Sequence, residues 1–325
     1  MSYSIIRPAD HAGWLAERAK GIGSSEVGTI FGVNSFDSPL KLWRRKVGLD
    51  GPVEETEAMT LGHAFEDGVA REFARKTGAI IDESSSIDWL AVDDEHPWRR
   101  VSPDRMFWKK GTPPEERTLA NATMLECKTT SHNVSDENIP DYWFCQVQYQ
   151  MGVLGLKSCC LAWVTAFGGR FHHDYCEISF NQGFFDTLMA KVDTFWNVNI
   201  LGHVEPEDVL TLSDASLKWR ATKDRRAVAD EQTLGAIKDF LCLKAESERL
   251  KELKDEMELR IKNAMRNADT LVDSSDRILA TWREFKGRDS FDTETFKEEN
   301  PEIYSRYIKS GSPSRRFCIK APKAS

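Results

Sequence analysis

The stretch that decides the fold is Met124-Leu125-Glu126-Cys127-Lys128-Thr129-Thr130, which follows Ser102-Pro103-Asp104 in the chain. Apolar residues beside Glu126 favour a β-strand, and the two-residue period of a strand places Glu126 and Lys128 on one face and Cys127 on the other. Carboxylate oxygens are hard ligands that suit Mg²⁺ or Mn²⁺. An acid after a proline, followed by an acid and a lysine on a strand, therefore predicts a metal site for phosphodiester hydrolysis.

Such a reaction must stabilise negative charge on the phosphorus oxygens and on the leaving oxygen, and two divalent ions about 3.5–4 Å apart can do so. We expect Asp104 to bridge the ions, with Glu126, the backbone carbonyl of Cys127 and Glu66 as further ligands. Lys128 is placed to polarise the attacking water. Alone, Asp104 could be a turn residue, Glu126 and Lys128 an exposed strand face, and Glu66 a surface residue. Their order in the chain favours the metal site.

The composition indicates a soluble globular protein of one large domain, or of one domain with an appendage. Of its 325 residues, 40% are hydrophobic and 30% charged. No apolar run approaches the roughly 18 residues of a membrane span, and the N-terminus lacks a signal-peptide pattern. Seven cysteines without a CxxC pair predict reduced thiols in the cytoplasm and disfavour an iron–sulfur cluster. We therefore expect a cytoplasmic protein that does not associate with membranes.

The net charge of −8 is unusual for a protein that binds DNA, because phosphate contacts commonly require a basic surface. Binding would require basic residues to be concentrated locally. Two clusters have the required density, and each could equally be a solvated face. The clusters are Lys41, Arg44, Arg45 and Lys46, and Arg99, Arg100, Arg105, Lys109 and Lys110.

Helical and strand periods alternate over residues 1–204. A turn at 21–26, with Ser24 or Ser25 as helix cap, is also expected. Helices are expected over residues 10–20, 39–46, 60–77, 140–154 and 184–200. Strands are expected over residues 80–81, 89–92, 100–101, 106–108, 123–128, 158–167 and 171–180. This order predicts an α/β (α+β) fold with a central mixed sheet flanked by helices.

Residues 205–325 differ in character. A charged helix over 227–267 has apolar residues at three-four spacing, which fits a coiled-coil arm, a helical hairpin or simple packing against the core. Short strands are expected over 271–272, 278–282 and 316–319, and a helix over 291–299. We expect this part to be a helical extension with a small β element that packs on the core or forms an oligomer or partner surface.

The chain resembles the YqaJ-like viral recombinase group of the PD-(D/E)XK nucleases, whose best-known relative is lambda exonuclease. The resemblance covers about residues 12–200 and depends on five motifs in the same order. These are Trp14 and Arg18 before Ile22-Gly23-Ser24-Ser25-Glu26-Val27, then Leu61-Gly62-His63-Ala64-Phe65-Glu66, Ser102-Pro103-Asp104, Glu126-Cys127-Lys128, and Cys145-Gln146-Val147-Gln148-Tyr149-Gln150-Met151.

The resemblance assigns roles to individual residues. It implies a metal-binding and catalytic set of Glu66, Asp104, Glu126 and Lys128. It implies a pocket for a terminal 5′-phosphate formed by Arg18, Ser25, Ser102 and Gln146. The guanidinium, hydroxyl and amide groups of such a pocket are good phosphate donors. Met59 would be an apolar wedge that splits the duplex end, although it could equally be a core residue at a helix start. Gln146 could likewise be a polar helix residue, and Ser25 a helix cap.

The resemblance also implies an activity and partners. Such enzymes digest linear double-stranded DNA from 5′ ends with Mg²⁺ and leave 3′ single strands for phage-type recombination by strand annealing. It implies a ring-shaped homotrimer with basic residues along its channel, a single-strand annealing recombinase as partner, and a phage- or prophage-encoded protein in a bacterial cytoplasm. The loop at 109–122 and the tail beyond about residue 205 are not in the minimal nuclease pattern.

Two other functions stay open from the sequence. One is a PD-(D/E)XK endonuclease, which would cut a closed circular DNA that an end-dependent enzyme leaves intact. The other is a non-catalytic protein that binds DNA ends. The complete set of Asp104, Glu126 and Lys128 favours catalysis over this second alternative.

Overall fold

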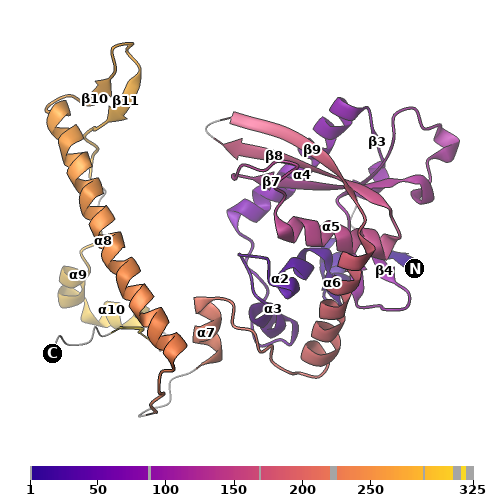
Figure 1. Cartoon of the computed structure of the whole chain (residues 1–325), viewed down its shortest axis with the longest axis horizontal. Helices are drawn as coiled ribbons and strands as arrows, with labels where there is room; N and C mark the ends of the chain where they lie inside the picture. The colour runs from indigo at the N-terminus through magenta and orange to yellow at the C-terminus, as the bar shows by residue number, and fades with distance from the viewer. Residues whose placement is uncertain are drawn as a thin grey trace. The chain divides into compact units, whose positions relative to one another are not determined.

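The computed structural model describes residues 2–86, 89–167, 170–219, 225–287, 290–309 and 316–319. The chain divides into two compact units, Met1–Trp219 and Arg220–Ser325 (Figure 1). The first unit extends beyond residue 204, where the sequence placed the boundary, because helix α7 (Leu212–Lys218) is anchored in it. Asp214 of α7 is fully buried and accepts a hydrogen bond of 2.6 Å from the hydroxyl of Ser38.

The helices of the first unit begin and end at residues with recognisable capping chemistry. Asp10 accepts a hydrogen bond of 2.7 Å from the backbone of Gly13 at the start of α1. Gly78 and Gly155 end α4 and α5 in the left-handed conformation that glycine adopts without strain. Besides α7, these helices are α1 (His11–Arg18), α2 (Val27–Phe31), α3 (Pro39–Lys46), α4 (Glu57–Thr77), α5 (Asp141–Leu154) and α6 (Gln182–Thr194), which continues as a π-helical segment (Phe195–Ile200).

The expectation that Ser24 or Ser25 caps a helix is wrong. The segment Ser24–Glu26 is itself a 3₁₀ turn, η1, and its cap position is Gly23. The carboxylate of Glu26 reaches back and accepts a hydrogen bond of 2.8 Å from the backbone of Gly23. This bond takes the place of a serine cap, so both serine hydroxyls are available for other partners.

The described strands of the first unit form two mixed sheets. A four-stranded sheet has the order β1 (Tyr3–Ile6), β4 (Leu90–Asp93), β5 (Arg99–Val101) and β2 (Ile22–Gly23). A five-stranded sheet has the order β3 (Ile80–Ile81), β6 (Arg105–Trp108), β7 (Thr123–Thr130), β8 (Ser158–Phe167) and β9 (Arg170–Ser179). The β2–β5 and β7–β8 pairs are parallel. The expected α/β class is confirmed. The chain passes from one sheet to the other between β5 and β6, at Pro103, because proline lacks the backbone N–H that a continuing strand needs.

Strand β7 is covered on both faces. Leu125 and Cys127 pack toward α4, against Val69 and Phe73. Met124 belongs to the other, larger core, which includes α5. The alternation of a strand therefore places Glu126 and Lys128 on one face, as the sequence predicted, and the structure shows that this face meets α5.

The second unit contains one long helix, a hairpin and two short helices. These elements are α8 (Glu231–Met265), β10 (Thr270–Val272), β11 (Ile278–Thr281), α9 (Thr293–Glu299) and α10 (Pro301–Tyr307). Helix α8 is continuous and is not a helical hairpin. The prediction of a strand over 316–319 is wrong, because these residues are irregular and have no strand partner among the described residues. No helix in the described ranges has the length and apolar character to cross a membrane.

Candidate active site

A hydrogen bond joins the side chain of Asp104 to the backbone of the strand that carries Glu126. Asp104 directly precedes β6, and Arg105 of β6 pairs with Leu125 of β7. This register brings Oδ2 of Asp104 within 2.7 Å of the backbone nitrogen of Cys127, which donates a hydrogen bond to it. The two motifs that are separate in the sequence therefore meet at neighbouring strands.

Glu126 is the most enclosed member of the site, with 1% of its surface exposed. Its Oε1 accepts hydrogen bonds from Nζ of Lys128, at 2.7 Å, and from the amide of Gln146. Its Oε2 accepts one from the amide of Gln150 at 3.0 Å. Lys128 also donates to Oε1 of Gln146 at 3.0 Å. Lysine, glutamate and glutamine thus form a closed triangle between β7 and α5.

The electrostatics of the site favour a cation beside two carboxyl groups. Burial raises the pKa of the Asp104 carboxyl well above its usual range, and the adjacent charge of Glu126 raises it further. Burial acts against the charged form of Lys128, but the carboxylates of Glu126 and Asp104 outweigh it and raise the pKa of this lysine. Lys128 is therefore a cation at neutral pH, able to stabilise negative charge and not to accept a proton.

Glu66 approaches from α4, on the other side of β7. Its negative charge contributes to the raised pKa of Asp104, which places it near the site. Its carboxylate lies 2.9 Å from Nδ1 of His63, one turn earlier in the same helix. Within the described ranges, no three His, Cys, Asp or Glu side chains lie close enough to hold an ion as they stand.

The donor set nevertheless fits a hard divalent cation. Asp104, just before β6, and Glu126, on β7, supply carboxylate oxygens, and the backbone carbonyl of Cys127 directly follows Glu126 in the chain. Desolvation and then the neighbouring charge of Glu126 raise the pKa of Asp104, and a cation would favour the charged form of both carboxyl groups. The thiol of Cys127 faces α4, and burial raises its pKa, so this sulfur is an unsuitable ligand.

The predicted phosphate pocket is partly assembled around Arg18. Nη2 of Arg18 donates a hydrogen bond of 2.5 Å to the hydroxyl of Ser25, and its guanidinium lies 5.1 Å from the ring centroid of Trp14. A Cβ at Gly23 would lie 2.9 Å from Nε of Arg18, so a larger residue here would displace the guanidinium from this position. Ser102 follows β5 as Ser25 follows β2, and because these strands are parallel, both serines lie toward the same edge of the sheet.

Gln146, the fourth predicted member of the pocket, lies with Glu126 and Lys128. Its contacts place it in the carboxylate cluster, whereas Arg18 and Ser25 contact each other. Gln150 joins the two groups, because its amide also lies 3.3 Å from the hydroxyl of Ser24. Oε1 of Gln150 is buried and has no hydrogen-bond partner among the described residues.

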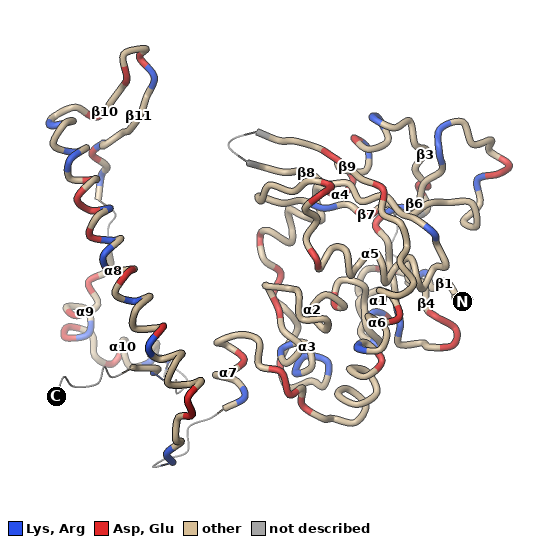
Figure 2. Tube along the Cα trace, viewed as in Figure 1, with Lys and Arg blue, Asp and Glu red and all other residues tan. Residues whose placement is uncertain are grey.

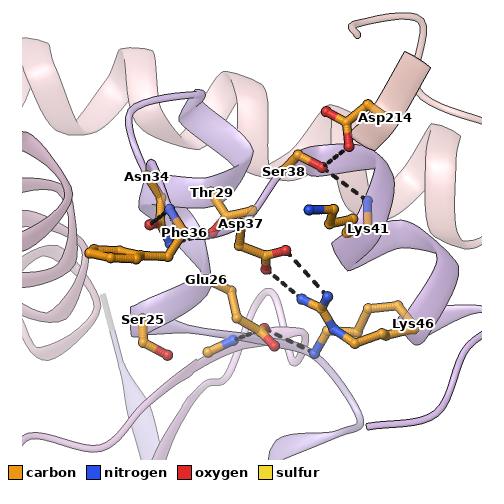
Figure 3. A network of polar contacts seen from close by, with 12 residues as sticks. Ser25, Glu26, Thr29, Asn34, Phe36, Asp37, Ser38, Lys41, Lys46 and Asp214 are labelled. Carbon is orange, nitrogen blue, oxygen red and sulfur yellow. Dashed lines mark hydrogen bonds and ion pairs between the residues drawn. The ribbon is translucent and has the colours of Figure 1, made fainter. Parts of the chain in front are cut away.

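A network of polar contacts fixes the segment that carries Ser25 (Figure 3). Nζ of Lys46, from α3, lies 2.9 Å from Glu26 and donates a hydrogen bond of 2.6 Å to the carbonyl of Gly21. A Cβ at Gly21 would lie 2.2 Å from the carbonyl oxygen of Trp98, so the chain can pass here only as glycine. Lys46 therefore holds the segment that carries Ser25 in place, and its ammonium group is occupied by these contacts rather than available to a ligand.

The two basic clusters are largely neutralised by acidic partners, and Figure 2 shows the two kinds of charge interspersed along the chain. Each of their five arginines forms an ion pair with an acidic residue, and Arg99 pairs with two. The pairs are Arg44–Asp50, Arg45–Asp37, Arg99–Asp93, Arg99–Asp193, Arg100–Glu17 and Arg105–Asp67. These clusters therefore contribute less free positive charge than the sequence suggested.

Met59 lies in the first turn of α4 and is 43% exposed. It precedes Glu66 by two helical turns, so both residues lie on one stripe of the helix, about 10 Å apart along its axis. Met59 is exposed and lies on the same side of α4 as Glu66, a candidate metal ligand. This position agrees with the predicted wedge, and it excludes the alternative that Met59 is a core residue.

Sequence reasoning missed Gln150 and Ser24. The signal for Gln150 was its four-residue spacing from Gln146, which places both amides on the same side of α5. The signal for Ser24 was weaker, because its contact with Gln150 depends on how η1 packs against α5.

Comparison with known proteins identifies the family. The chain is 30% identical over 317 residues, covering 94% of this chain and 93% of the relative, to the uncharacterized protein YqaJ of Bacillus subtilis (strain 168). The YqaJ-like viral recombinase domain matches residues 13–157. The chain belongs to the YqaJ-like viral recombinase family. In this YqaJ-like chain the matched domain contains all five sequence motifs.

Two solved structures are similar to part of this YqaJ-like protein. One is an alkaline exonuclease (LHK-Exo) from Laribacter hongkongensis, with a TM-score of 0.45 and 17% identity, covering 58% of this chain and 92% of that chain. The other is a phage related exonuclease from Haemophilus somnus 129PT, with a TM-score of 0.38 and 9% identity, covering 57% of this chain and 96% of that chain.

Proposed function

We propose that the chain is a metal-dependent 5′→3′ exonuclease that digests linear double-stranded DNA from 5′-phosphorylated ends. The observation that carries the proposal is the cluster in which Asp104, Glu126 and Lys128 come together across β6 and β7. The buried carboxylate of Glu126 with the half-buried carboxyl of Asp104 and the half-buried Lys128 cation are the groups that phosphodiester hydrolysis needs, and membership of a viral recombinase family agrees with it.

In the proposed mechanism each side chain has a defined task. Bound Mg²⁺ or Mn²⁺, as two ions, would supply Lewis acidity and lower the pKa of the attacking water. Asp104, Glu126, Glu66 and the Cys127 carbonyl would hold the metal. Lys128 donates hydrogen bonds to the phosphate oxygens as negative charge develops, and its enclosed position makes that interaction stronger than it would be in water.

The end specificity is proposed to come from Arg18, Ser25 and Ser102. A guanidinium and two hydroxyl groups can donate several hydrogen bonds to a terminal phosphate, which offers more oxygens and more charge than an internal phosphodiester. Gln146, which bonds Lys128, would orient the phosphate relative to the catalytic groups. Met59 would separate the terminal base pair.

The biological role proposed is phage-type homologous recombination by strand annealing. The enzyme would produce 3′ single strands and deliver them to a single-strand annealing recombinase. A ring-shaped homotrimer would hold the duplex during digestion. Sedimentation or light scattering of the purified protein would test the trimer, and a monomer that digests DNA processively would contradict it.

The activity is tested with one plasmid in two forms. The purified protein is incubated with Mg²⁺ and either the covalently closed circle or the linear form with 5′-phosphates. We expect loss of the linear form and an intact circle. A cut circle would establish an endonuclease instead, and no change in either form would favour a protein that binds DNA ends without cleaving them.

A further inference from the structure

A pocket opens beside the C-terminal end of β7, the strand that carries Glu126 and Lys128. It has a volume of about 210 Å³, and its lining includes Phe36, Thr130, His132, Asn133, Asn138 and Tyr142. Thr130 lies two residues beyond Lys128 and on the same face of the strand. At about 3.3 Å per residue, the two Cα atoms lie about 7 Å apart, which matches two base steps of about 3.4 Å along a DNA strand.

Phe36 is exposed yet firmly positioned. The residue is 74% exposed, although exposure of a phenyl ring to water is unfavourable. Its backbone nitrogen donates a hydrogen bond of 3.0 Å to Oδ1 of Asn34, and Nδ2 of Asn34 donates one of 2.9 Å to the hydroxyl of buried Thr29 (Figure 3). The ring is thus presented on an anchored turn, which lowers the entropic cost of binding a partner.

Tyr142 forms the second wall. Its ring meets that of Phe36 edge to face, with centroids 6.1 Å apart and an interplanar angle of 81°. The close packing of α2 on α5 restricts Tyr142, because a Cβ at Gly28 would lie 2.7 Å from its Cβ. Two perpendicular rings make a corner in which a flat molecule can stack on one ring and meet the edge of the other.

The chemistry of the lining indicates which part of a nucleic acid would fit. The lining includes His132 but no Asp or Glu and no Lys or Arg, the permanently charged cations that commonly bind phosphate, so it favours a base over a phosphate. The amides of Asn133 and Asn138 can donate to and accept from the edge of a base. Its volume is below the roughly 300–1,000 Å³ of pockets for drug-sized ligands, which suits one planar ring system.

We propose that this pocket, the Phe36 pocket, binds one unstacked base of the DNA substrate, with Phe36 as its stacking surface. The inference rests on the proposed function for the DNA substrate and adds a contact to a base, which no residue of the catalytic cluster or phosphate pocket makes. Stacking on an aromatic side chain contributes enough binding energy that its loss weakens binding about fivefold or more. The occupied pocket holds the strand in register while the neighbouring phosphodiester is hydrolysed.

The test places 2-aminopurine, a base whose fluorescence reports stacking, at each of the first four positions from the 5′-phosphate of a duplex. Binding to the full-length protein is followed with Ca²⁺ in place of Mg²⁺. We expect a fluorescence change at one position. Phe36→Ala should abolish it and raise the Kd about fivefold or more, whereas Phe36→Trp should retain it. An abasic site at that position should make wild type and Phe36→Ala bind alike.

Phe171→Ala is the matched control, because Phe171 has a similar exposure of 76% and lies on β9. It should bind as wild type does. Equal fluorescence changes and equal Kd values for wild type and Phe36→Ala would overturn the proposal. If wild type does not bind duplex ends, a single strand with 2-aminopurine at the same positions distinguishes failure of the proposed exonuclease function from failure of the proposed base-binding pocket. A signal there that depends on Phe36 supports the pocket without the proposed function, and no binding to either DNA overturns both.

Discussion

The side-chain amide of Gln150 donates a hydrogen bond of 3.0 Å to Oε2 of Glu126 and lies 3.3 Å from the hydroxyl of Ser24. Ser24 directly precedes Ser25, which is hydrogen-bonded to Arg18. The candidate metal ligand and the candidate phosphate pocket are therefore connected through one buried amide. This connection identifies Gln150 as a positioning residue.

Gln150→Leu should lower kcat about ten- to hundredfold, because a hydrogen bond to a charged group contributes about 1.5–3 kcal/mol. KM should change much less, since no substrate contact is removed. Steady-state kinetics on a linear duplex would measure both. Gln148→Leu is the control from the same helix, because Gln148 is equally buried but bonds Ser179 and Asn181. It should lose stability and keep kcat, and equal kcat losses in the two variants would contradict the positioning role.

Lys128→Ala should reduce the cleavage rate about 10²–10³-fold, the loss expected when one positioned donor to a developing negative charge is removed. The raised pKa of Lys128 means that its charged form is the one lost. Binding of DNA ends, measured by fluorescence anisotropy, should persist. Cleavage at the wild-type rate would contradict the assignment of this lysine.

Asp104→Asn should change how stability depends on pH in metal-free protein. The folded-state pKa of Asp104 is raised above its ordinary value of about 4, so its contribution to stability is present below that value and is lost as pH rises through the folded-state pKa. Asparagine has no proton to lose. Thermal unfolding in a chelator at pH 5 and pH 8 should show a larger loss for wild type than for the variant.

Added Mg²⁺ should then raise the unfolding temperature of wild type at pH 8, because a ligand that binds only the folded state stabilises it. The Asn variant should respond less. An identical response of both proteins to pH and to Mg²⁺ would show that Asp104 neither titrates as described nor binds the metal.

Arg18→Ala should slow digestion of 5′-phosphorylated ends more than digestion of 5′-hydroxyl ends, because only the former present the terminal charge that Arg18 would bind. Initial rates on two otherwise identical duplexes would measure the ratio. Arg71→Ala is a suitable control, since Arg71 is an exposed arginine paired with Asp67 on α4. An equal loss on both ends for Arg18→Ala would exclude a phosphate pocket.

Asp214→Ala should destabilise the first unit by about 2 kcal/mol. The carboxylate caps α7 by accepting hydrogen bonds from the backbone of Leu210 and Thr211, and it accepts the buried Ser38 hydroxyl. A lost cap costs about 0.5–2 kcal/mol, and an unpaired buried group about 1–3 kcal/mol. Denaturant unfolding would measure the change. An unaltered midpoint would show that α7 is not a stabilising part of this unit.

Elements with their own local signal were predictable from the sequence. Strand β7 has an apolar run, α4 has a helical period that ends at a glycine, and both were expected, although α4 begins three residues earlier, at Glu57. Strand β2 was missed because its two residues have no period, and it exists only through pairing with β5.

The candidate site follows the same rule. The proximity of Asp104, Glu126 and Lys128 was predictable, since it depends on strand alternation and on pairing of neighbouring strands. Gln150 was not, because a glutamine in a helix is normally exposed, and only the burial of nearly the whole of α5 makes it a partner of Glu126. The pairing of Arg99 with Asp193 was equally hidden, because the partners are distant in sequence.

The most direct test of the central claim uses a linear duplex that carries a 5′-phosphate on one strand and a 5′-hydroxyl on the other, with a different label in each strand. The protein is added with Mg²⁺, and the lengths of both strands are followed with time. The account predicts that the phosphorylated strand shortens from its 5′ end while the other strand stays intact. Equal loss of both strands, or shortening from a 3′ end, would contradict it.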